Sequence, residues 1–186
     1  MPPLVLASAS PRRLDLLRQI GIEPAAIDPA HTDETPHPNE APRAYAERMA
    51  RAKLAVVTPR HAAALVLAAD SVVAVGRRIL PKAESEGEAR DCLGLLSGRR
   101  HKVVGGLALA EPGGKVRTRL VETVVRFKRL EPGEVEAYIA SGEWQGKAGG
   151  YAIQGRAAAF VAFISGSYSN VVGLPLFETA ALLRSA

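Results

Sequence analysis

Apolar residues recur along the chain in two patterns, short uninterrupted runs and runs at helical spacing. The segment "LVL" at residues 4–6 predicts a short buried strand, and the apolar residues after "SPRR" recur at nearly helical spacing up to Gly21. Residues 23–42 are rich in proline, aspartate, histidine and threonine, which predicts a loop. Residues 40–57 then predict an amphipathic helix.

The middle of the chain predicts strands joined by tight turns. The segment "AALVLAAD" indicates a buried strand with Asp70 at its C-terminal end, and a second apolar run turns at Gly76 into a hairpin. Residues 84–98 predict a helix that ends at Gly98. Two or three alternating strands are expected next, around the turn at residues 112–114.

The last third predicts a helix over roughly 132–141, a glycine-rich loop "GKAGGYAIQG", a tight turn at "SGSYSN" and a C-terminal helix from Leu176. Because strands and helices interleave throughout, the fold class is α/β, with a mixed twisted sheet flanked by helices. No linker divides the chain, and 186 residues with 47% apolar content suffice for one core. Residues 1–186 are therefore expected to form a single domain.

The amino-acid composition limits the cellular compartment and the classes of binding partner that we expect. The net charge of +5 favours anionic partners such as nucleotides or nucleic acid. The single cysteine, Cys92, excludes an internal disulfide and indicates a reducing compartment, so we expect the cytoplasm. The longest apolar stretches, near residues 62–69 and 157–164, are far shorter than the roughly 20 residues of a membrane span, so no membrane association is expected.

The segment "SASPRR" at residues 8–13 is a candidate anion site. Ser10 is a predicted N-cap and Pro11 the first helical residue, so backbone N–H groups and the positive end of a helix dipole face any ligand there. Arg12 and Arg13 add guanidinium forks that match phosphate oxygens. The alternative is an ordinary cap with two solvated arginines. Because cations oppose the dipole at a helix start, we favour anion binding.

Two carboxylates are candidates for metal binding. Asp70 follows a buried strand, where α/β proteins place residues that contact ligands, although it could equally cap a turn. Glu34 lies in the proline-rich loop, where a solvated acid is the alternative. Together they could hold Mg²⁺, because magnesium sites use one or two carboxylates and leave the remaining positions to phosphates and water.

The other polar residues are weaker candidates. Lys53 and Lys82 are expected to be ordinary surface lysines, because nothing in the neighbouring sequence suggests another role. His101 fits a buried core position as readily as the position of a catalytic base. The loop around Lys147 is not a P-loop, because its glycines are too closely spaced and Ala148 stands at the Ser/Thr position. A loop of this composition is compatible with phosphate or base binding. Aromatic residues make up 5% of the chain and are not interleaved with basic ones, which argues against a stable nucleic-acid complex.

Several segments taken in order resemble the Maf family of nucleoside triphosphate pyrophosphatases. They are "LASASPRRLDLLRQIGI", "DET" at residues 33–35, "RMARAKLA", "AADSVV", the helix ending "LSGRRHKV", "KAGGYAIQG" and "SGSYSNVVGLPLFET". The resemblance implies a fold related to inosine triphosphatase-like proteins, with two lobes around a nucleotide cleft. It also implies hydrolysis of a nucleoside triphosphate between its α and β phosphates with a divalent metal, Mg, Mn or Co.

The resemblance also assigns roles to individual residues. It implies Asp70 as proton acceptor, with Glu34, Lys53 and Lys82 in the catalytic set and Ser8, Arg12, Arg13, Ser71 and Gln154 binding the substrate. The residues themselves add Ser10 to the substrate-binding set, as part of the serine turn, and Glu34 and Asp70 as metal ligands. Three of the substrate-binding residues, Arg12, Ser71 and Gln154, match positions associated with substrate preference and are similar to the branch that acts on dTTP and UTP. The chain departs from the usual pattern at Ala83, Gly105 and Gly146.

Two other functions stay open at this stage. A nucleotide-binding regulator of cell division, linked to septum formation, would use the same cleft without turnover. A nucleic-acid-binding module would show tight binding that weakens steeply with salt. The choice between canonical and modified nucleotides is also open, as is a homodimer.

Overall fold

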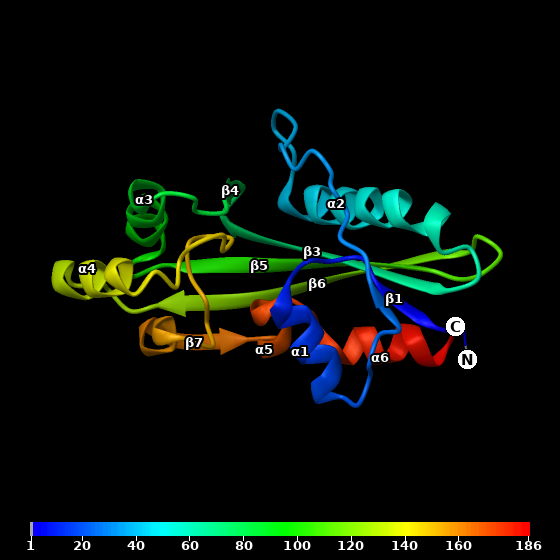
Figure 1. Ribbon diagram of the computed structural model, residues 1–186. Helices are drawn as coiled ribbons and strands as arrows, with labels where there is room; N and C mark the ends of the chain where they lie inside the picture. Colours follow the sequence, from blue (N-terminus) through cyan, green and yellow to red (C-terminus); the bar gives the residue numbers. More distant parts are fainter. Residues whose placement is uncertain (1) are drawn as a thin grey trace.

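The computed structural model describes residues 2–186, which form a mixed seven-stranded sheet with helices on both faces (Figure 1). The strand order is β2-β1-β3-β5-β6-β7, and the short β4 pairs with β3. The strands are β1 (Leu4–Leu6), β2 (Ala26–Ile27), β3 (Leu65–Val75), β4 (Arg78–Leu80), β5 (Arg100–Ala110), β6 (Val116–Phe127) and β7 (Val161–Ser165). Only the pairs β1–β2 and β1–β3 are parallel, so the predicted mixed α/β class is confirmed.

Except for one short helix at residues 168–172, the α-helices match the predicted pattern closely. They are α1 (Pro11–Gln19), α2 (Pro42–Val57), α3 (Glu86–Leu96), α4 (Pro132–Ser141), α5 (Tyr168–Val172) and α6 (Leu176–Arg184), with the single-turn 3₁₀ helices η1 (Thr58–Arg60) and η2 (Arg156–Phe160). Proline occupies the first helical turn of α1, α2 and α4. Its fixed φ suits that position, which explains why these starts were readable from sequence.

The predicted position of Asp70 at a strand end is wrong. Strand β3 continues through Asp70 as far as Val75, because β5 pairs with it antiparallel from Val66 to Ala74. On the edge of β3 opposite β5, the pairing strand changes along the length of β3. Strand β1 pairs with residues 65–67 and β4 with residues 73–75, so Asp70 lies mid-strand, beside a stretch of edge between these two partners.

Alternation along β3 sends Asp70 and Ser71 to opposite faces of the sheet. Leu65, Leu67 and Ala69 pack in the core beneath α1 and α6. Val66 and Ala68 pack in the core beneath α2. By the same alternation Asp70 faces α2, whereas Ser71 faces α1.

The core divides into two lobes that share the long strands. One apolar cluster joins α3 and α4 with the loop after α4 and η2. The other clusters lie around β1, with α1 and α6 on one face and α2 on the other. Figure 1 shows α3 and α4 together at one end of the sheet, beyond the end of α2. The expected cleft lies between these lobes.

The predicted N-cap of α1 is confirmed in position, and one other local prediction needs correction. Ser10 occupies the N-cap position of α1, but its side chain makes no capping hydrogen bond. The segment "SGSYSN" is not only a turn, because Ser167 caps the short helix α5 and Asn170 lies inside it. The hydroxyl-rich sequence does not predict this helix, because Ser and Asn favour turns. In residues 2–186 no helix is long and apolar enough to cross a membrane.

Candidate active site

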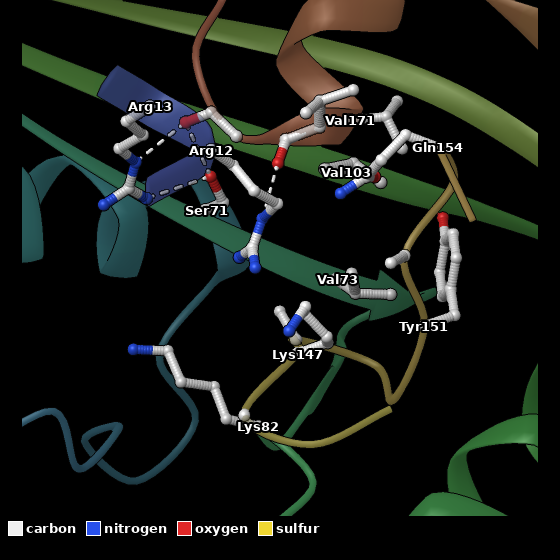
Figure 2. A pocket seen from close by; sticks show the side chains of 15 residues that line it. Arg12, Arg13, Ser71, Val73, Lys82, Val103, Lys147, Tyr151, Gln154 and Val171 are labelled. Atoms are coloured by element: carbon white, nitrogen blue, oxygen red, sulfur yellow. Dashed lines mark hydrogen bonds between the residues drawn. The ribbon is translucent and has the colours of Figure 1, made fainter. Parts of the chain in front are cut away.

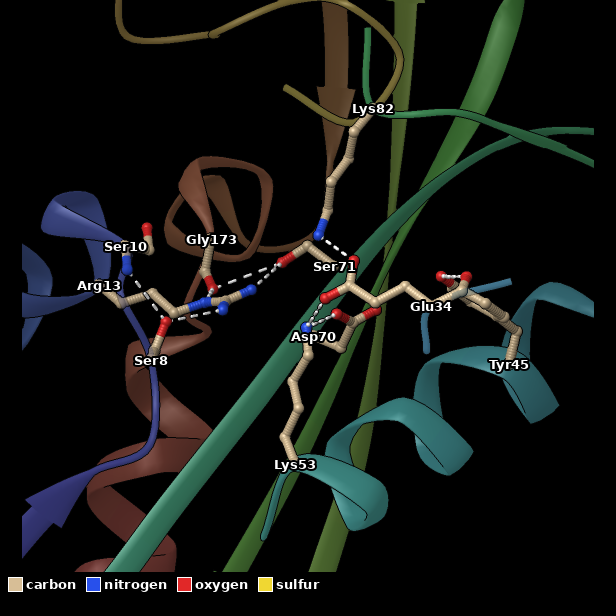
Figure 3. A network of polar contacts seen from close by, with 10 residues as sticks. All are labelled: Ser8, Ser10, Arg13, Glu34, Tyr45, Lys53, Asp70, Ser71, Lys82 and Gly173. Atoms are coloured by element: carbon tan, nitrogen blue, oxygen red, sulfur yellow. Dashed lines mark hydrogen bonds and ion pairs between the residues drawn. The ribbon is translucent and has the colours of Figure 1, made fainter. Parts of the chain in front are cut away.

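A cluster of two carboxylates and two lysines lies at the open edge of β3 (Figure 3). The Lys53 ammonium lies 2.6 Å from Asp70 Oδ1 and 2.7 Å from Glu34 Oε1. Lys82 contacts the other oxygen of Glu34. Asp70 is 2% exposed and Lys53 6% exposed. Buried charges are costly unless paired, so this cluster holds together only as a unit.

The ionisation of Glu34 is controlled by the two lysines. Its partial burial would raise the pKa, but hydrogen bonds from Lys53 and Lys82 outweigh that effect and lower the pKa to about 2. Glu34 is therefore ionised throughout the physiological range. Its loop is held by Tyr45 of α2, whose hydroxyl donates to the Glu34 carbonyl over 2.8 Å.

Close packing of α2 on the sheet brings Lys53 to Asp70. Gly106 of β5 lies directly opposite Asp70 in the strand register. A Cβ added at Gly106 would come within 2.3 Å of the Ala46 carbonyl oxygen in α2. The absent side chain lets the helix backbone approach the strand, so that a buried lysine of α2 reaches the β3 carboxylate.

The serine turn, residues 8–10, supplies hydroxyl donors beside this cluster. Ser8 Oγ accepts from the Ser10 N–H over 3.2 Å and from Arg13 Nη1 over 3.1 Å. Both lone pairs are then used, so the Ser8 hydroxyl proton remains to donate to a ligand. Ser10 Oγ has no hydrogen-bond partner within the described residues. These two hydroxyls are suited to an anionic acceptor.

The two arginines of α1 are held differently. Arg13 uses three nitrogens within the protein, donating to Ser8, to Ser71 Oγ over 3.3 Å and to the Gly173 carbonyl over 2.9 Å. Burial lowers the pKa of Arg13. Within residues 2–186, Arg12 is hydrogen-bonded only through Nε, to the Val172 carbonyl over 3.3 Å, and its terminal nitrogens point into the cavity in Figure 2. Arg12 therefore has more free donors for a ligand.

Two adjoining hollows form the cleft. The first, here called the basic pocket, is lined by polar residues that include Ser8, Ser10, Arg12, Arg13, Glu34, Lys53 and Lys82. The second, called the loop pocket, lies between β3 and the loop after α4 and is lined by Arg12, Ser71, Val73, Lys147, Tyr151 and Gln154, among others (Figure 2). Arg12 and Lys82 line both, so one extended ligand could occupy the two together.

Every predicted site residue except Asp70 lines one of the two hollows, whereas Asp70 is buried behind Lys53 and lines neither. Lys53 is not the surface lysine of the alternative interpretation, because it is buried and paired. The alternative in which the arginines are merely solvated is also wrong. His101 belongs to the core, where burial lowers its pKa to about 4 and its Nε2 lies 2.7 Å from the Tyr151 hydroxyl.

Three residues of the cleft were missed or left undecided by the sequence. His31 lines the basic pocket, Lys147 lines the loop pocket and Tyr45 supports Glu34. Lys147 had a detectable signal, the glycine-rich loop around it. Its pKa is lowered, first by burial and then by the nearby Arg12. His31 and Tyr45 lack such a signal, because each depends on how a loop folds back over α2.

The carboxylates suit a hard cation only in part. Within residues 2–186, no group of three or more His, Cys, Asp or Glu side chains could hold a metal ion. Glu34 and Asp70 offer hard oxygen donors, but three of their four carboxylate oxygens contact a lysine ammonium. A divalent ion would fit here with most of its ligands coming from a bound phosphate chain and water.

Comparison with known proteins places this geometry in context. A family model described as "Maf-like protein" matches residues 3–186. A dTTP/UTP pyrophosphatase of Paramagnetospirillum magneticum is 66% identical over 183 residues, covering 98% of this chain and 96% of its own. One of Rhodospirillum rubrum is 65% identical, covering 97% and 86%, and one of Caulobacter vibrioides is 60% identical, covering 98% and 94%.

A solved structure shares the fold at much lower identity. The HAM1 protein of Coxiella burnetii has a TM-score of 0.53 and 18% identity, with 100% of both chains covered. At that identity the likeness concerns the fold alone. It agrees with the fold that the resemblance implied.

Proposed function

Because the chain belongs to the family of Maf-like proteins, we propose that it hydrolyses dTTP and UTP to the nucleoside monophosphate and pyrophosphate. The observation that carries the proposal is the buried Lys53 ammonium, held between Asp70 and Glu34 at the floor of a pocket lined by hydroxyls and cations. A triphosphate is the ligand class that matches several donors along an extended hollow.

In this proposal the basic pocket binds the phosphate chain. Arg12, Lys53 and Lys82 offset its negative charge, and the hydroxyls of the serine turn donate to its oxygens. Donors fixed before the substrate arrives favour the charge that develops on the phosphoryl oxygens in the transition state.

Asp70 is proposed to orient water for attack on the α-phosphorus. The water oxygen forms the new bond to phosphorus, the bond from the α-phosphorus to the bridging oxygen breaks, and pyrophosphate leaves with that oxygen. Asp70 accepts the proton of the water and passes it to solvent. Lys53 keeps one Asp70 oxygen fixed, which leaves the other to face the water.

The loop pocket is proposed to receive the base. Arg12, Ser71 and Gln154 line it with hydrogen-bonding groups, and Val73 and Tyr151 give it apolar walls. The selectivity for thymine and uracil rests on the relatives at 60–66% identity, which are named dTTP/UTP pyrophosphatases.

A divalent cation is a further part of the proposal, with Glu34 and Asp70 as its protein ligands and phosphate oxygens and water as the rest. Such an ion would supply charge neutralisation at the reacting phosphates. We also propose a cytoplasmic location, which is supported by the single cysteine, Cys92, free and buried in the core.

The decisive experiment measures pyrophosphate released from dTTP, UTP and a panel of canonical and modified triphosphates, with and without Mg²⁺, Mn²⁺ or Co²⁺. Release from dTTP and UTP is expected, with Asp70→Asn lowering kcat by about 100-fold or more while the protein stays folded. A wild-type protein that binds nucleotide without releasing pyrophosphate would replace the enzyme with a nucleotide-binding regulator. Asp70→Asn with wild-type turnover would remove the role given to Asp70.

A further inference from the structure

The two arginines at the start of α1 receive their orientation from α5. Arg12 Nε donates to the Val172 carbonyl over 3.3 Å, and Arg13 Nε donates to the Gly173 carbonyl over 2.9 Å. These carbonyls stand at the C-terminal end of α5, where unpaired carbonyls attract cations. The placement of both guanidinium groups therefore depends on where α5 sits on the sheet.

Asn170 fixes α5 to the sheet. Among the five residues of α5 it is the only fully buried one, so a polar contact anchors the helix beside the half-buried packing of Val171 and Val172 against the core. Its Nδ2 lies 3.1 Å from the Val103 carbonyl of β5 and 3.2 Å from the Val121 carbonyl of β6. One amide thus joins α5 to two neighbouring strands.

Thr123 of β6 completes the anchor. Its Oγ1 lies 3.1 Å from Asn170 Nδ2, accepts from the Ser167 N–H over 3.1 Å and donates to the Ser167 carbonyl over 3.2 Å. Ser167 Oγ in turn caps the helix by accepting from the Asn170 N–H. Both Thr123 and Asn170 are 0% exposed. Hydrogen bonds in such a dry site are geometrically strict, because losing one leaves a buried polar atom unpaired.

Gly105 provides the room for this anchor. A Cβ added at Gly105 would lie 2.0 Å from Asn170 Oδ1 and 3.1 Å from its Cγ. The Asn170 side chain can therefore adopt its present position only because residue 105 has no side chain. This gives a physical reason for glycine at one of the positions where the chain departs from its family pattern.

We propose that Asn170 is a positioning residue for the arginine pair, acting through the Val172 and Gly173 carbonyls. The inference rests on the proposed function, since it assumes that Arg12 and Arg13 serve the triphosphate site. Removing the Asn170 amide loosens α5 on the strands, so that Arg12 loses the fixed Val172 carbonyl and Arg13 loses one of its three acceptors, the Gly173 carbonyl. Displacement of a binding group by about 1 Å is enough to lower catalysis by about 100-fold.

The test compares Asn170→Ala with Thr179→Val. Thr179 is also 0% exposed, but its hydroxyl donates to the Pro175 carbonyl at the start of α6 and not to a strand or to a carbonyl that holds an arginine. Asn170→Ala should raise KM for dTTP and weaken binding of inorganic tripolyphosphate, measured by calorimetry, by about tenfold or more. Thr179→Val should lower Tm while leaving KM and tripolyphosphate affinity near wild type.

A second single variant and a double variant test the positioning role of Asn170 independently. Gly105→Ala should reproduce the loss of tripolyphosphate affinity, because its methyl group displaces the Asn170 side chain. In an Arg12→Ala background, Asn170→Ala should cost less than in the wild type, because one of the two arginines it positions is gone. Equal costs in both backgrounds, or an Asn170→Ala protein with lowered Tm and wild-type affinity, would reduce Asn170 to a structural role.

The outcomes also separate this inference from the proposed function. Tripolyphosphate binding is measured without turnover, so it tests Asn170 even if no nucleotide is cleaved. A wild-type protein that binds tripolyphosphate and cleaves no triphosphate would overturn the proposed function alone. A wild-type enzyme whose tripolyphosphate affinity is unchanged by Asn170→Ala would overturn the inference alone.

Discussion

Replacing Glu34 by glutamine removes a carboxylate that two lysines hold in its charged form. The pKa of Glu34 is about 2 in the folded protein, against 4.5 for an unperturbed glutamate. That difference of about 2.5 in pKa sets an upper bound of ~3.4 kcal/mol on its contribution to stability. The side chain is 33% exposed, so solvent screening reduces the contribution to about 1–2 kcal/mol.

The sign of the pH dependence follows from the lowered pKa. Above about pH 5, Glu34 is ionised in both the folded and the unfolded chain, and its full contribution is present. As the pH falls toward 2, the unfolded chain takes up the proton first and the contribution disappears, more than about half of it by pH 3. His101, whose folded pKa is about 4, also destabilises the protein in acid. That effect is common to both proteins and cancels in their difference.

The assay is urea unfolding of the wild type and Glu34→Gln between pH 7 and pH 3, followed by the fluorescence of the single tryptophan, Trp144. The free energy of unfolding of the variant should be lower at pH 7, and the difference between the two proteins should shrink to less than about half of that value at pH 3. Glu23→Gln is the matched control, because Glu23 pairs with Arg18 on the surface and is 64% exposed. A difference that stays constant from pH 7 to pH 3 would refute the reasoning.

Three further substitutions test the site and its loop. Tyr45→Phe removes the hydroxyl that holds the Glu34 carbonyl, so kcat/KM should fall about 3- to 10-fold with little change in Tm. Gly149→Ala should lower the free energy of unfolding by about 1–3 kcal/mol in urea titrations, because its φ is +67° and a Cβ would lie 2.8 Å from Val73 Cγ1. Arg12→Ala should change the ratio of kcat/KM between UTP and CTP by about tenfold or more, because Arg12 lines the loop pocket as well as the basic pocket.

Each of these has a control in the same chain. Tyr138→Phe removes a different buried hydroxyl, bonded to the Ala152 N–H, and should lower Tm more than it lowers kcat/KM. Gly94→Ala lies in α3 with open space around it and should stabilise the protein. Arg18→Ala removes a surface arginine of α1 and should leave the UTP to CTP ratio unchanged. An Arg12→Ala protein that slows all substrates by one common factor would limit Arg12 to phosphate binding.

The helices were predictable because proline and glycine mark their ends. The start of α4 at Pro132 and its end before Gly142 are both visible in the sequence. The end of strand β3 was less predictable, because an acidic residue, Asp70, interrupts the apolar run and such an interruption usually indicates the end of a buried strand. Its continuation depends on pairing with β5, which begins 30 residues after Asp70, and no local pattern reports such a partner.

The site residues were predicted from motifs, but their environments were not. The burial of Lys53 depends on the close approach of α2 at Gly106, which is a tertiary contact. Two arginines at the start of α1 are unfavourable for a helix in isolation, and the sequence does not reveal the hydrogen-bond acceptors that hold them. Those acceptors include backbone carbonyls of Val172 and Gly173, and a carbonyl has no signature in a sequence.

The link from α1 to α5 also orders events during synthesis of the chain. The two carboxylates and two lysines of the cluster lie within the first 82 residues, whereas the carbonyls that accept from the Nε atoms of Arg12 and Arg13 lie 160 residues after these arginines. A ribosome would therefore expose the acidic and basic side chains of the cleft long before the arginines could be oriented. The phosphate-binding arrangement is completed only when residues 167–174 are made, so a chain truncated before them would keep the carboxylates and lysines but would lack the α5 carbonyls that orient Arg12 and help to orient Arg13.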